Sequence, residues 1–116
     1  MKKASPLSVI GKKKAEAKRI MSYSRYKKCE SIIRKASLTP LAGEKTQVKM
    51  ATELGWAFGI DISTAEAKSR IAEIKSEIDL LSGSMMAVAV LPVLPMASNG
   101  ATEAIGWTLA VDFANV

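Results

Sequence analysis

Lysine and arginine side chains are concentrated in the first third of the chain, and they have the clearest chemical role. Residues 1–36 hold twelve of them against Glu16 and Glu30, a net charge of +10, whereas the remaining residues carry −4. Grouped cations bind anions such as nucleic-acid phosphates without reading the base sequence. Tyr23 and Tyr26 lie among them, and tyrosine adds hydrogen bonding or stacking. The sequence therefore predicts a polyanion-binding surface in this third.

We expect one basic helix, from Lys12 to about Ala36, to present this surface. An apolar stripe at spacings of three and four predicts its packed side, and it consists of Tyr26, Cys29, Ile33 and Ala36. Pro40 ends the helix, because the residue before a proline avoids helical geometry. The predicted contact residues are Lys12, Lys13, Lys14, Lys18, Arg19, Tyr23, Arg25, Lys27, Lys28, Arg34 and Lys35.

Side chains that catalyse reactions or bind soft metals are scarce. The chain has no histidine and one cysteine, Cys29, and no glycine-rich phosphate loop is present. Asp61 and Asp112 occupy matching places in two similar segments and would suit acid–base work or a divalent ion if they met. The plainer interpretation is two polar residues on outer faces of strands. We therefore predict no enzyme, no cofactor and no metal site.

Cysteine and tryptophan each allow a structural and a chemical interpretation. Cys29 falls on the apolar stripe and is expected to be buried, although an exposed thiol among these cations would have a lowered pKa. Trp56 and Trp107 each follow a glycine in an alternating apolar run. We expect both rings in the core, with stacking against nucleic-acid bases as the alternative.

Two segments recur at a spacing of about fifty residues. ATELGWAFGID (51–61) returns as ATEAIGWTLAVD (101–112), and AEAKRI (15–20) returns as AEAKSRI (65–71). A fixed period of this size indicates a duplicated supersecondary unit. Chance similarity is the alternative, because the intervening segments hardly match.

Alternating apolar residues predict β-strands in the second half of each repeat. Residues 56–62 and 105–113 alternate with period two, and 85–91 reads as a buried strand. Asn99-Gly100 predicts a hairpin turn before the last strand. The stretch 80–97 is apolar enough to consider as a membrane span, but its prolines argue against that interpretation.

Two further helices are expected. Residues 44–54 are ambiguous between helix and strand, and we favour a short helix that stops at Gly55. Ser63 and Glu66 form a capping box that begins the clearest helix of the chain, which ends at Gly83. Its apolar stripe consists of Ala67, Ile71, Ile74, Ile78 and Leu81.

The predicted fold class is α+β, with a small, mainly antiparallel sheet covered by helices on one face. Residues 12–116 form a single domain of two related halves, about 12–62 and 63–116. Residues 1–11 are a flexible basic arm.

We predict a small, non-enzymatic accessory protein that binds DNA or RNA with weak sequence selectivity, or another polyanion, through its basic helix. The alternative is a structural or protein-interaction subunit, such as a phage-like particle component or a protein inhibitor, that docks on an acidic protein. A membrane-associated small protein is a further alternative, against which the prolines within 80–97 argue. We also expect that the protein could form a homo-oligomer through its apolar C-terminal third. The expected location is cytoplasmic, or virion-associated if the protein is phage-like.

Overall fold

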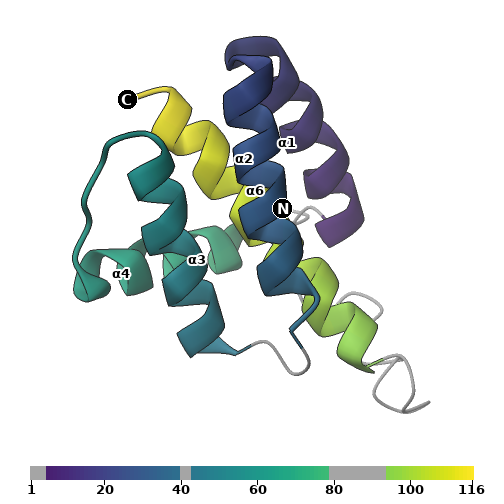
Figure 1. Cartoon of the computed structure of the whole chain (residues 1–116). Coiled ribbons are helices and arrows are strands. Elements are labelled where there is room, and N and C mark those ends of the chain that lie inside the picture. The colour runs from purple at the N-terminus through teal and green to yellow at the C-terminus, as the bar shows by residue number, and fades with distance from the viewer. Residues whose placement is uncertain (1–4, 40–42, 79–93) are drawn as a thin grey trace.

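The structure, a computed structural model, describes residues 5–39, 43–78 and 94–116, and these form helices joined by short connections (Figure 1). The helices are α1 (Pro6–Ile20), α2 (Tyr23–Ser37), α3 (Glu44–Ala57), α4 (Thr64–Glu77) and α6 (Leu94–Ala114). Within these ranges there is no β-strand and no sheet. The predicted α+β class is therefore wrong, and the described chain is an all-helical bundle.

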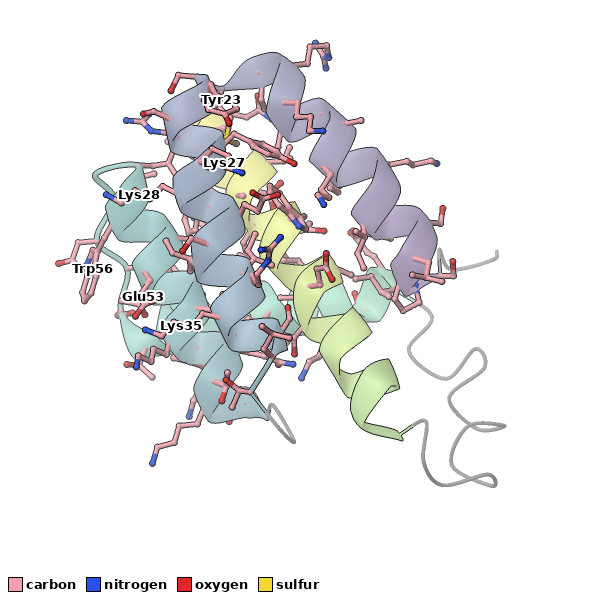
Figure 2. The ribbon with its side chains drawn as sticks, turned by 45° about the vertical axis from the view of Figure 1, so that its right-hand side comes forward. Tyr23, Lys27, Lys28, Lys35, Glu53 and Trp56 are labelled. Atoms are coloured by element: carbon pink, nitrogen blue, oxygen red, sulfur yellow. The ribbon has the colours of Figure 1, made fainter. Side chains whose placement is uncertain are left out.

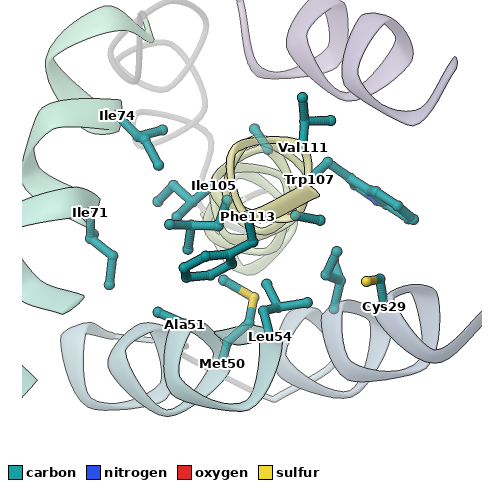
Figure 3. Close-up of a cluster of buried hydrophobic side chains, with 14 of the residues drawn as sticks. Cys29, Met50, Ala51, Leu54, Ile71, Ile74, Ile105, Trp107, Val111 and Phe113 are labelled. Carbon is teal, nitrogen blue, oxygen red and sulfur yellow. The ribbon is translucent and has the colours of Figure 1, made fainter. Parts of the chain in front are cut away.

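The helix α6 lies at the centre, and α1, α2, α3 and α4 all pack against it. Figure 3 looks along α6 and shows side chains from the surrounding helices converging on it. A helix covered on several sides has no polar face, so its sequence is apolar almost all round. Its buried side chains include Ala104, Ile105, Trp107, Leu109, Ala110, Val111 and Phe113.

The alternation that predicted a strand over 105–113 arises from side-chain size in this central helix. Of the residues between the large ones, Gly106 and Ala110 are small, and Thr108 is buried with its hydroxyl donating to the carbonyl of Ala104; Asp112 alone is polar and exposed. A Cβ on Gly106 would lie 2.8 Å from Cγ1 of Ile33 and 2.9 Å from Sδ of Met50, so α6 approaches α2 and α3 closely there. Asn99 and Gly100 lie inside α6, so the predicted hairpin turn is also wrong.

The helix α3 continues past Gly55, where we expected it to stop, and takes in Trp56. Its end is a Schellman motif: the amide of Ile60 donates to the carbonyl of Gly55 at 2.8 Å, and that of Gly59 donates to Trp56 at 2.9 Å. Gly59 has φ +73°, a left-handed conformation that glycine adopts without strain. The predicted strand 56–62 is therefore a helix end, a turn and an extended connection.

The basic segment forms two helices rather than one. Ser5 caps α1, with Pro6 in the first turn, so the helix begins inside the range predicted as a flexible arm. After a break at Met21, the Ser22 hydroxyl accepts a hydrogen bond from the Arg25 amide at 3.2 Å and caps α2. Both serine caps are visible in the sequence, but the continuous run of helix-forming residues concealed the break.

The apolar stripes predicted for α2 and α4 are confirmed. Tyr26, Cys29, Ile33 and Ala36 are buried, and so are Ala67, Ile71, Ile74 and Ile78. Ser63 caps α4 as expected, but α4 ends at Glu77 rather than at Gly83. Leu81 and the predicted strand 85–91 lie outside the described residues.

The recurring segments are helical in both copies except for residues 58–61, which follow the end of α3. Residues 15–20 lie in α1 and 65–71 in α4, while 51–57 lie in α3 and 101–112 in α6. The pairings also correspond, because α1 packs on α6 and α4 packs on α3. Duplication stays a prediction that this correspondence supports.

None of the helices in the described ranges is both long enough and apolar enough to cross a membrane. The apolar stretch 80–97, considered above as a span, lies largely outside those ranges. The apolar residues of α6 between 104 and 113 are buried within the chain's own core.

Candidate nucleic-acid interface

Charge is divided among the helices with little overlap. The helices α1 and α2 each carry five cations and one carboxylate, a net charge of +4 each. Cations and carboxylates balance in α3 and in α4, and α6 carries only Glu103 and Asp112. The two basic helices are consecutive and lie next to one another in Figures 1 and 2. The positive charge of the protein is therefore concentrated on the side that these two helices form.

The protein's own carboxylates neutralise little of this charge. Among the predicted contact residues, and within the described part of the chain, Lys27 alone makes an ion pair: its Nζ lies 2.8 Å from Oε1 of Glu30. This hydrogen bond raises the pKa of Lys27 and lowers the pKa of Glu30. Exposed pairs of this kind contribute little to stability.

Three of the predicted cations lie over aromatic rings and help to hold the fold. In each case the charged group is within the range of a cation–π interaction. Lys14 lies 5.8 Å from the Trp107 ring centroid, Lys18 5.6 Å from that of Tyr26, and Arg25 5.0 Å from that of Phe58.

Asp61 and Asp112, which the sequence suggested as a possible pair, have different neighbours. Asp61 accepts a hydrogen bond from Nε1 of Trp56 at 3.3 Å. Burial raises the pKa of Asp112, and the nearby cations Lys13 and Arg70 oppose that rise. Lys13 is therefore near α6, and it is half-buried. Among the described residues, no three His, Cys, Asp or Glu side chains are grouped as metal ligands.

The remaining predicted residues form the outer faces of the two basic helices. Lys12 and Arg19 are exposed on one side of α1. The outer face of α2 follows helical spacing and consists of Lys27, Lys28, Ser31, Arg34, Lys35 and Leu38, all exposed. Part of it borders a shallow hollow of about 420 Å³. Four cations thus lie along one face of a single helix.

The helix α3 adds two cations that the sequence analysis missed, Lys45 and Lys49, both exposed. Lys49 and Lys35 line a groove of about 210 Å³ between α2 and α3, together with Glu53. A helical register for 44–57 would have placed both lysines on one face with Trp56. The ambiguous periodicity of that segment concealed this arrangement.

Two aromatic side chains are exposed beside these cations and two are buried. Tyr23 is 77% exposed and Trp56 is 60% exposed, so the expectation that Trp56 lies in the core is wrong. Trp107 is 1% exposed, as expected, and stacks on Tyr26 with ring centroids 5.1 Å apart. Figure 2 shows Tyr23 and Trp56 with Lys27, Lys28 and Lys35.

Cys29 is buried in the core, as its position on the apolar stripe predicts. Burial raises the pKa of its thiol to about 11, although Arg25 and Lys28 act to lower it. A protonated, inaccessible thiol is a poor nucleophile.

Comparisons with protein-family models, with characterised proteins and with solved structures found no match.

Proposed function

We propose that this is a non-enzymatic accessory protein that binds nucleic acid through the outer faces of α1 and α2. One observation carries the proposal: two adjacent helices hold a net charge of +4 each, and few of their cations are paired within the described residues. Unpaired cations on a rigid scaffold attract a polyanion and release its condensed counterions on binding.

The character of the binding follows from the same residues. Lysine and arginine contacts to phosphate fix position but carry no sequence information. Six cations are exposed on the two outer faces: Lys12, Arg19, Lys27, Lys28, Arg34 and Lys35. If about five of them contact phosphates, the logarithm of the binding constant falls with the logarithm of salt concentration at a slope of roughly −3.5 for a single strand.

A salt series tests this proposal. We expect labelled DNA and RNA oligonucleotides of mixed sequence to bind at low ionic strength, with fluorescence anisotropy falling steeply as sodium chloride is added. Absence of binding at the lowest salt concentration would overturn the proposal. Polyglutamate serves as a competitor, because equal displacement by it would favour docking on an acidic protein instead.

Matched charge reversals locate the surface. Lys28→Glu on the outer face of α2 should weaken binding several-fold. It should also make the slope of the logarithm of the binding constant against the logarithm of salt concentration shallower, by the amount that one phosphate contact contributes. Lys68→Glu, on the charge-balanced helix α4, changes the net charge by the same amount at an exposed position. Equal losses in the two variants would indicate a dependence on net charge without a defined surface.

A further inference from the structure

Trp56 occupies a position that the polyanion surface alone does not explain. It is the last residue but one of α3, directly before the glycine-containing turn, and it leaves most of its indole in solvent. The hydrogen bond from Nε1 to Asp61 restrains the ring without covering it. Its counterpart in the other repeat segment, Trp107, is buried in the core. Core packing therefore accounts for one tryptophan and not for the other.

Cations of α2 share the face of the molecule on which this ring lies (Figure 2). The Arg25 guanidinium stacks over Phe58, two residues beyond Trp56, and so fixes the first turn of α2 against the end of α3. Lys28 is one helical turn after Arg25 and is exposed. Figure 2 shows Lys28 and Trp56 on the same side of the molecule. The Lys28 charge and the exposed indole therefore belong to the same face of the molecule (Figure 2).

The positive surface continues from this point along the groove between α2 and α3. Lys35 follows Lys28 by two helical turns, about 10 Å along α2. Lys35 and Lys49 border the groove from opposite helices, and Glu53 is the carboxylate between Lys49 and Trp56. An aromatic platform at one end and a row of cations leading away from it are the two components of single-strand recognition.

We infer that this face takes single-stranded nucleic acid, with an unpaired base stacked on Trp56 and the adjoining phosphates on Lys28, Lys35 and Lys49. The inference depends on the proposed function and names its substrate class. In a duplex the bases are stacked on each other and do not present their faces to a side chain, whereas a single strand offers them freely. The Trp56 ring therefore distinguishes single-stranded from double-stranded nucleic acid, whereas the cations alone do not.

Substitution of the ring tests the platform. Trp56→Ala should weaken binding of a single-stranded oligothymidylate about tenfold or more, and leave duplex binding of the same length unchanged. Trp56→Phe retains an aromatic face and should recover most of the loss. Because the ring is exposed, neither change removes a core contact; circular dichroism and the emission of the buried Trp107 check that the fold is retained.

Tryptophan emission supplies an independent readout. Binding of the oligothymidylate should quench the indole emission of the wild-type protein, and this quenching should disappear in Trp56→Phe, which keeps Trp107. Unaltered emission on binding, or equal losses for single and double strands in Trp56→Ala, would overturn the inference while leaving the proposed function intact. Failure of every nucleic acid to bind would overturn both.

Discussion

The buried cysteine shows how position decides chemistry at the scale of one residue. Cations such as Arg25 and Lys28 would activate a thiol on an exposed surface, yet burial outweighs them and raises the pKa of Cys29 to about 11. Helical spacing of the apolar stripe was sufficient to predict this outcome from the sequence. The exposed indole of Trp56 was not predictable in the same way, because its exposure depends on where α3 ends.

The raised pKa of Cys29 predicts how stability depends on pH. The folded state favours the neutral thiol of Cys29. Its contribution to the free energy of unfolding is therefore fully present below about pH 9, the ordinary thiol pKa, and is lost as pH rises through about 11. The free energy of unfolding, measured by urea denaturation, should fall over this interval. Cys29→Ala should reduce the fall, and the remaining slope includes Tyr26, whose pKa is also raised by burial. Rapid alkylation of the native thiol at neutral pH would contradict this account.

At the scale of helices, the sequence predicted the amphipathic elements and missed the central one. Each of α2 and α4 buries one side and exposes the other, so the period of 3.6 residues is visible in the sequence. The helix α6 is surrounded, and its small residues take the positions where a surface helix would carry polar ones. The resulting alternation of large and small side chains resembles the sequence pattern of a β-strand, and only tertiary contacts distinguish such a buried helix from a strand. The candidate site was incomplete for a related reason: Lys45 and Lys49 lie in a segment predicted as a short helix, but they share a face with Trp56 only because α3 continues past Gly55.

Close approach of helices at Gly106 predicts a large effect of one methyl group. Gly106→Ala would force its Cβ against Ile33 and Met50, so we expect a loss of about 1–3 kcal/mol in the free energy of unfolding. Gly11→Ala in α1 is the matched control, because nothing lies within 4 Å of its added Cβ. That change should stabilise the protein by roughly 0.5–1 kcal/mol through helix propensity. Urea denaturation measures both, and equal effects would refute the close packing.

At the scale of the whole molecule, charge segregation has opposite effects on binding and on stability. The adjacent helices α1 and α2 repel one another through their like charges, and α6 provides only two carboxylates to compensate. Salt screens this repulsion over a Debye length of about 10 Å at 0.1 M. The same screening weakens the attraction of a polyanion.

Added sodium chloride should therefore stabilise the protein while it releases nucleic acid. We expect the midpoint of urea unfolding to rise between very low and about physiological ionic strength. Lys12→Gln combined with Arg19→Gln, both exposed on α1, should raise the midpoint at low salt and reduce its salt dependence. A midpoint that falls with salt in the wild type would show that ion pairs outweigh the repulsion.

The central place of α6 also determines when the bundle can assemble. Its four neighbours precede it in the chain, so during translation they leave the ribosome before the helix that buries their apolar sides. Until α6 is synthesised, α1 to α4 lack their common partner, and a nascent chain halted before Leu94 would expose the residues that normally contact it. Native packing of α1 to α4 therefore waits for α6, and contacts between α1 and α6 join segments far apart in sequence.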